Sequence, residues 1–106
     1  MKLFQIKDMI KGWFIGDFDQ SVYKTKDVEV GLKEYLAGAY EPAHHHNVAT
    51  EFTVIVDGIV EMSGKQFSKG DIIKIDPGVS TDFKALTNVI TLIVKIPSVL
   101  NDKYLD

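Results

Sequence analysis

The sequence predicts an all-β fold, either a sandwich or a barrel. Its apolar residues form short runs of β-branched and aromatic types, and Gly, Asp, Asn and Pro separate these runs. The runs recur about every ten residues, a spacing that favours a sandwich or barrel over alternating strands and helices. A length of 106 residues is typical of one domain, and no linker or repeat divides the chain.

Three strands are predicted in the first part of the chain. Residues 28–36 alternate between apolar and polar types, as a half-buried strand does. Residues 51–56 are rich in β-branched types and end at Asp57-Gly58, a dipeptide that favours a tight hairpin turn. Residues 59–62 are then the return strand, and Ser63-Gly64 marks the next turn.

Two further strands are predicted in the second part. Residues 72–75 are an apolar run that ends at Asp76-Pro77-Gly78, where proline removes a ladder donor and glycine permits positive φ. Residues 89–96 form the longest predicted strand, which Pro97 closes. The core of the domain is therefore expected over residues 28–97.

The two ends of the chain lie outside this predicted core. The segment from Phe4 to Ile15 is more apolar than one small barrel needs to cover itself. We expect residues 1–27 to pack on the barrel or to add strands to a partner subunit. Residues 98–106 form a polar tail, which is expected to fray or dock loosely.

Composition and charge exclude several classes of function. The net charge is −3 and no basic cluster occurs, so the electrostatic signature of nucleic-acid binding is absent. The chain has no cysteine and therefore no disulfides or thiolate ligands. Charges at Lys7, Asp8 and Lys11 interrupt the N-terminal apolar run, which argues against a secretory signal, and no segment has the length of a membrane span. A cytoplasmic protein is expected.

The three histidines are adjacent and are the main chemical signal in the sequence. In a strand, His44 and His46 point to one face and His45 points to the other. Two imidazoles on one face, with a carboxylate nearby, can begin a divalent metal site. Glu51 is out of phase with His46, so a turn or bulge between them must reset the alternation if Glu51 is to join the site. A histidine-rich surface loop is the other interpretation.

The residues around the histidines resemble the first motif of the cupin family. Gly38, His44, His46, Glu51 and Gly58 match this motif at every fixed position and spacing. The resemblance implies a small single-domain cupin of the cupin-2 type, with a double-stranded β-helix (jelly-roll) barrel. It also implies that His44, His46 and Glu51 are metal ligands.

The second cupin motif is degenerate in this chain. It begins at Gly70-Asp71, but the histidine of the family pattern is replaced by Thr81 or Asp82, depending on whether one counts from Gly70 or from Pro77. Asp82 is the better fourth ligand, because a charged oxygen binds such cations better than a neutral hydroxyl. With Thr81 at that position, two histidines and one carboxylate remain. A barrel that no longer holds metal is the remaining alternative.

The resemblance implies a small-molecule enzyme that uses a divalent first-row ion (Fe, Mn, Ni, Co or Zn). It allows an isomerase or epimerase, a lyase or a dioxygenase, because the barrel is a common scaffold and the site decides the chemistry. A non-catalytic cupin that binds a sugar or small acid is the alternative. Expected partners are a small-molecule ligand and a second copy in a homodimer, with no nucleic acid and no membrane.

Other polar side chains are weaker candidates for the site. Tyr35, Tyr40 and Thr81 are candidate substrate contacts, and strand alternation allows only one of Tyr35 and Glu34 to point inward. Trp13 is expected in the core or at a dimer contact. Lys95 lies within an apolar strand and is expected on a solvated face of the sheet.

Overall fold

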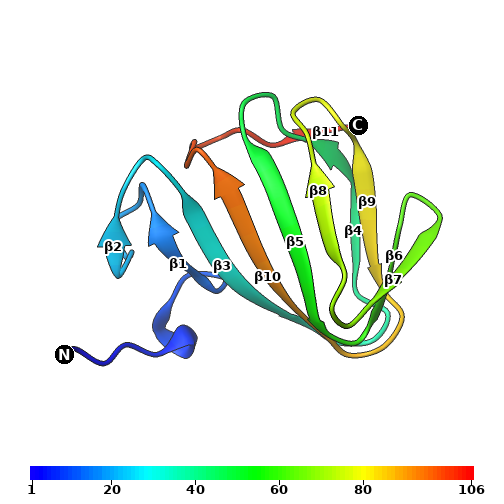
Figure 1. Cartoon of the computed structure of the whole chain (residues 1–106), viewed down its shortest axis with the longest axis horizontal. Coiled ribbons are helices and arrows are strands. Elements are labelled where there is room, and N and C mark those ends of the chain that lie inside the picture. The colour runs from blue at the N-terminus through cyan, green and yellow to red at the C-terminus, as the bar shows by residue number, and fades with distance from the viewer.

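The computed structural model of the protein describes all 106 residues, which form two β-sheets that face each other (Figure 1). One sheet has six strands in the order β2-β1-β3-β10-β5-β8. These strands are β1 (Trp13–Gly16), β2 (Tyr23–Lys24), β3 (Glu29–Tyr35), β5 (Thr50–Asp57), β8 (Ile72–Ile75) and β10 (Val89–Ile96). The prediction of an all-β fold is thereby confirmed.

The second sheet has five strands in the order β11-β4-β9-β6-β7. These strands are β4 (Tyr40–His45), β6 (Ile59–Met62), β7 (Lys65–Ser68), β9 (Thr81–Ala85) and β11 (Tyr104–Leu105). Apart from the strands, the chain forms one 3₁₀ turn, η1 (Ile6–Asp8). None of its helical structure is long and apolar enough to cross a membrane.

The predicted hairpin at Asp57-Gly58 is wrong. β5 pairs with β10 and β8, whereas β6 pairs with β7 and β9, so the dipeptide carries the chain from one sheet to the other. Gly58 has φ of +95°, and a Cβ there would lie 2.3 Å from the backbone oxygen of Asn88. The glycine is therefore required for a close crossing between the sheets and not for a two-residue turn.

The core is packed where β5, β6, β8, β9 and β10 approach one another. Seven buried apolar residues form it: Ile55, Val60, Met62, Ile75, Phe83, Ala85 and Val89. In β10, one of the two central strands of the six-stranded sheet, Thr91 and Ile93 are buried, while Leu92 and Val94 are half-buried on the opposite face. The sheet therefore has one face toward the interior of the barrel and a second apolar face toward the outside.

The N-terminal segment joins its own barrel. β1 pairs with β3 of the same chain, Gly12 accepts a hydrogen bond from the backbone of Leu32, and only the first few residues extend away from the sheets (Figure 1). Met1, Leu3 and Phe4 are exposed there.

The expectation that the C-terminal tail frays or docks loosely is wrong. β11 pairs with β4 at the edge of the five-stranded sheet, and Asp102 is only 6% exposed. Its carboxylate accepts hydrogen bonds from backbone N–H groups of residues 47–49, far earlier in the sequence, and these bonds fix the tail in place.

Candidate metal centre

A cavity of about 330 Å³ lies between the two sheets. Its walls come mainly from β3, β4, β5, β9 and β10, and a space of this size suits a small molecule. His44, His46 and Glu51 line the cavity, and His45 does not. The ring of His45 lies instead against the tail, where its Nδ1 is 2.8 Å from Asp106 Oδ1.

His46 is held firmly and in one orientation. The side chain is buried, and its Nδ1 donates a hydrogen bond to the backbone oxygen of Asp102. Because a carbonyl oxygen only accepts, the proton must be on Nδ1. The other ring nitrogen, Nε2, is buried without a hydrogen-bond partner and lies 3.5 Å from Glu51 Oε1. The tautomer therefore leaves Nε2 free to bind a cation.

Glu51 presents one carboxylate oxygen to His46. Its other oxygen, Oε2, accepts a 3.0 Å hydrogen bond from the Thr53 hydroxyl. Burial by itself raises the pKa of the Glu51 carboxyl, but the contact with His46 and the charge of Lys95 outweigh it, so the pKa lies below its ordinary value. The carboxylate is therefore charged at neutral pH and can act as a metal ligand.

A loop between β4 and β5 brings His46 and Glu51 together. The sequence required a reset of strand phase between them, and residues 46–49 leave the strand there. The carboxylate of Asp102 fixes this loop by accepting hydrogen bonds from the backbone N–H groups of Asn47, Val48 and Ala49, at 2.9, 3.1 and 2.9 Å. Asp102 thus holds the loop with its side chain and the His46 ring with its backbone.

His44 stands beside this pair without completing a cluster. Its ring lies edge-on to that of His46, with 5.3 Å between ring centroids, and its Nδ1 contacts the backbone oxygen of Pro42 at 3.2 Å. No three His, Asp or Glu side chains of the chain are grouped closely enough to hold a metal ion as they stand. The donor types nevertheless suit a first-row divalent ion, and the unpartnered Nε2 of His46 is where such an ion would bind.

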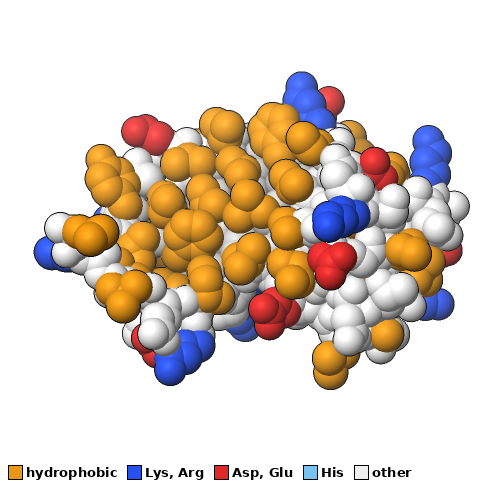
Figure 2. Space-filling model, turned by 60° about the horizontal axis from the view of Figure 1, so that its bottom comes forward, with side chains coloured by type: hydrophobic (Ala, Val, Ile, Leu, Met, Phe, Trp, Pro, Cys, Tyr) orange, Lys and Arg blue, Asp and Glu red, His pale blue; other side chains and the backbone are white.

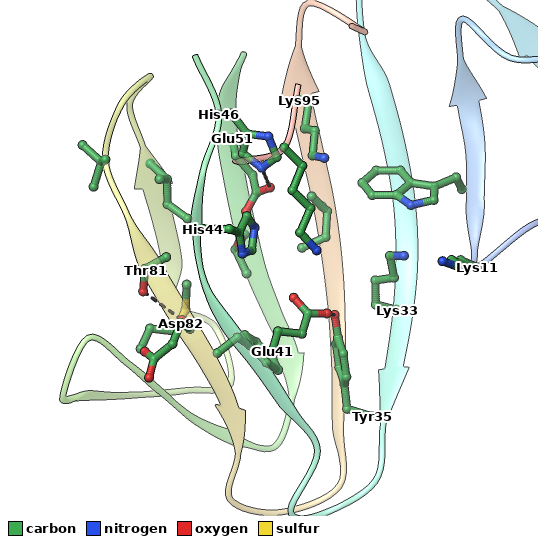
Figure 3. Close-up of a pocket in the computed structure, with 18 residues that line it drawn as sticks. Lys11, Lys33, Tyr35, Glu41, His44, His46, Glu51, Thr81, Asp82 and Lys95 are labelled. Carbon is green, nitrogen blue, oxygen red and sulfur yellow. Dashed lines mark hydrogen bonds and ion pairs between the residues drawn. The ribbon is translucent and has the colours of Figure 1, made fainter. Parts of the chain in front are cut away.

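The two candidates from the second motif are engaged elsewhere. Asp82 Oδ1 accepts a 2.8 Å hydrogen bond from the backbone N–H of Ser63, and Thr81 Oγ1 lies 2.9 Å from the Ser63 hydroxyl. Both residues line the cavity, but Figure 3 shows the Asp82 carboxylate pointing away from His46 and Glu51. The structure therefore does not bring Asp82 together with the other predicted ligands.

Of the predicted substrate contacts on β3 and β4, Tyr35 lines the cavity and Tyr40 does not. Tyr40 is 58% exposed, and the residue after it, Glu41, faces inward instead. The Tyr35 hydroxyl donates a 2.9 Å hydrogen bond to Glu41 Oε1. Burial and the negative charge of Glu41 raise the pKa of Tyr35, so its phenol stays protonated.

The prediction that Lys95 lies on a solvated face is wrong. Its side chain is 18% exposed and lines the cavity, together with Lys33 from the neighbouring strand. Trp13 also lines the cavity, and the ammonium groups of Lys33 and Lys95 lie 4.6 and 4.8 Å from the centroid of its ring. Strand alternation could have identified the lysines, because Lys95 is two residues after the buried Ile93 and Lys33 is two before Tyr35.

No protein-family model and no curated protein matches this sequence. Solved structures do match. An uncharacterised conserved protein with a double-stranded β-helix domain from Klebsiella pneumoniae superposes with a TM-score of 0.74 at 18% identity, covering 99% of this chain and 96% of that one. A cupin-2 domain protein from Shewanella frigidimarina gives 0.60 at 15% identity, covering 71% and 76%.

The DMSP lyase DddQ from Ruegeria pomeroyi also superposes, with a TM-score of 0.73 at 18% identity over 88% of this chain. The match covers 49% of that lyase, so this chain spans about half its length. At these identities the similarity concerns the fold and not the activity. The protein thus has the double-stranded β-helix fold of the cupins.

Proposed function

We propose that this protein is a metal-dependent enzyme acting on a small molecule, with a divalent first-row ion held by His44, His46 and Glu51. The observation that carries the proposal is the contact between His46 and Glu51. When the His46 ring is neutral, its proton is on Nδ1, so Nε2 and Glu51 Oε1 are then two acceptors that face each other across 3.5 Å in a buried site. A cation bound to both would remove this repulsion and satisfy the unpartnered nitrogen.

The rest of the cavity supports proton-transfer chemistry. A divalent ion bound at this site would polarise a carbonyl, carboxylate or hydroxyl oxygen of the ligand. Glu41 is a carboxylate in the cavity that can take a proton from the ligand, and the O–H of Tyr35, which stays protonated, keeps it oriented. This pair favours an isomerase, epimerase or lyase over a dioxygenase.

A cupin that binds a sugar or small acid without turnover is the second candidate. Neither Thr81 nor Asp82 supplies the histidine of the family pattern, and the hydrogen bond from Ser63 holds Asp82 away from the ligand pair. This candidate takes precedence if the protein binds no metal.

Titration of chelator-stripped protein with Mn²⁺, Fe²⁺, Co²⁺, Ni²⁺ and Zn²⁺ tests the ligand set. We expect Glu51→Gln to weaken binding by at least about tenfold, because it removes a charged ligand. We expect Asp82→Asn to change affinity by less than about twofold, because the amide oxygen can still accept from Ser63. Calorimetry measures both. A large loss in Asp82→Asn would make Asp82 a ligand, and unchanged affinity in Glu51→Gln would place any metal elsewhere.

A homodimer formed through the outer face of the six-stranded sheet belongs to the same proposal. Figure 2 shows hydrophobic side chains gathered into one broad surface. Leu92 stands at the centre of the outer face, directly between Leu32 on β3 and Val54 on β5, and all three are only half-buried. A sheet face this apolar is normally covered in solution.

Light scattering at tens of micromolar tests the dimer. We expect twice the mass of one chain for the wild type and a shift toward monomer for Leu92→Lys, because a charge at the centre of a closed interface is costly. Glu61→Lys is the control, since Glu61 is exposed on β6 in the other sheet and should leave the mass unchanged. A monomeric wild type would contradict the proposal.

A further inference from the structure

Lysine side chains collect on one side of the cavity. All twelve basic residues of the chain are lysines, and four of them line this cavity: Lys11, Lys33, Lys95 and Lys103. Figure 3 shows Lys11, Lys33 and Lys95 on the side away from Asp82. Lys33 and Lys95 project from β3 and β10, which are neighbouring strands in the six-stranded sheet, so the sheet fixes where they emerge.

These ammonium groups have few counter-ions. Lys95 Nζ lies 3.8 Å from Glu29 Oε2, and this is the one ion pair that any of the four lysines makes. The nearby carboxylate of Glu41 accepts a hydrogen bond from the neutral Tyr35 phenol and so keeps its charge. Four ammonium groups thus share the carboxylates of Glu29, Glu41 and Glu51, which leaves positive charge in excess on this side of the cavity.

Trp13 holds two of the lysines without neutralising them. The distances of 4.6 and 4.8 Å from its ring centroid to the Lys33 and Lys95 ammonium groups are those of cation–π contacts, which position a cation but leave its charge. Burial lowers the pKa of Lys33, as do the other lysines, against the opposing effect of Glu41. The contacts with Trp13 explain the position of the two ammonium groups, but they do not explain the accumulation of like charge.

We propose that Lys33 and Lys95 bind the anionic group of a small organic acid, which extends across the cavity toward His46 and Glu51. The extension toward His46 and Glu51 rests on the proposed function, whereas the anion site itself does not. The two lysines flank Trp13, and an anion that contacts their ammonium groups from the cavity side offsets the positive charge in a partly water-excluded space. A volume of about 330 Å³ restricts the ligand to a small molecule.

The ammonium group of lysine is a compact point charge and binds carboxylate or phosphate alike. The probes therefore distinguish these two anions. Chelator-stripped protein is titrated with succinate, with inorganic phosphate and with the neutral diamide succinamide, and amide NMR shifts are followed. We expect at least one anion to bind and the diamide not to bind. We expect Lys33→Met and Lys95→Met each to weaken that binding by at least about tenfold, the effect of losing a charge-assisted contact.

Two further variants separate the anion site from effects on folding. Lys33→Arg keeps the charge and should retain most of the binding. Lys74→Met removes a lysine that is 61% exposed outside the cavity and paired with Asp76, and it should change nothing. Melting curves identify any variant that has lost the fold, and the other cavity lysine then carries the test.

Metal binding by the same variants separates the two proposals. We expect Lys33→Met and Lys95→Met to retain metal binding, since neither residue is a ligand. If anion binding depends on the lysines but the protein has no affinity for metal, the proposed anion site stands and the proposed metal enzyme is wrong. Binding of succinate alone assigns a carboxylate, and binding of phosphate alone assigns a phosphate group. If neither anion binds, if succinamide binds equally well, or if folded Lys→Met variants bind as the wild type does, the anion site is wrong.

Discussion

Replacing Asp102 with alanine is expected to lower the free energy of unfolding by about 3 kcal/mol and to weaken metal binding by about 10- to 100-fold. The substitution leaves the N–H groups of Asn47, Val48 and Ala49 without their acceptor. The loop between β4 and β5 then loses its anchor. His46 loses its fixed orientation, because the Asp102 backbone oxygen that receives its Nδ1 proton moves with the tail.

Urea denaturation and metal titration measure the two effects on the same protein. Asp102→Asn should be intermediate, since an amide oxygen can still accept hydrogen bonds but carries no charge. Asp106→Ala is the matched control, because Asp106 lies in the same tail and contacts His45, which does not line the cavity. It should leave metal affinity unchanged. If Asp102→Ala has wild-type stability and affinity, the tail does not position the site.

The local part of the fold could be predicted from the sequence. Four strands were predictable because alternation and β-branched content are local properties. They are β3 (predicted at 28–36), β5 (51–56), β8 (72–75) and β10 (89–96). Strand pairing is not local. Asp57-Gly58 predicts a hairpin turn from its local composition, but the strand pairings show that the chain changes sheets there.

The site shows the same division. The common face of His44 and His46 and the phase reset before Glu51 follow from strand geometry. Tyr40 has the same parity as His44, yet it lies outside the cavity, because the β4–β9 register shifts between Glu41 and His44. Pro42 lies at this irregularity and is the one sequence signal for it, because proline within a sheet is confined to edges and bulges.

Long-range partners could not be predicted at all. The role of Asp102 depends on a backbone loop more than fifty positions earlier, so its polar neighbours in the sequence suggested only a loose tail. Asp82 looked like a ligand because no local feature shows that Ser63, from the turn between β6 and β7, holds its carboxylate.

His46→Ala is expected to reduce bound metal to background. The substitution removes the one ring nitrogen that is both buried and unpartnered in the cavity. The barrel should stay folded with a lowered melting temperature, because its core consists of apolar residues from five strands and His46 contributes one buried hydrogen bond. His45→Ala should retain the metal, since the His45 ring faces the tail.

The metal content of wild-type protein purified without chelator at neutral pH is the most direct test of the central claim. Elemental analysis should find about one first-row divalent ion per chain in the wild type and in His45→Ala, and none above background in His46→Ala. Absence of any such ion from the wild type, even after incubation with Mn²⁺, Fe²⁺, Co²⁺, Ni²⁺ or Zn²⁺, would contradict a metal enzyme. Equal metal in the wild type and His46→Ala would place the ion at a different site.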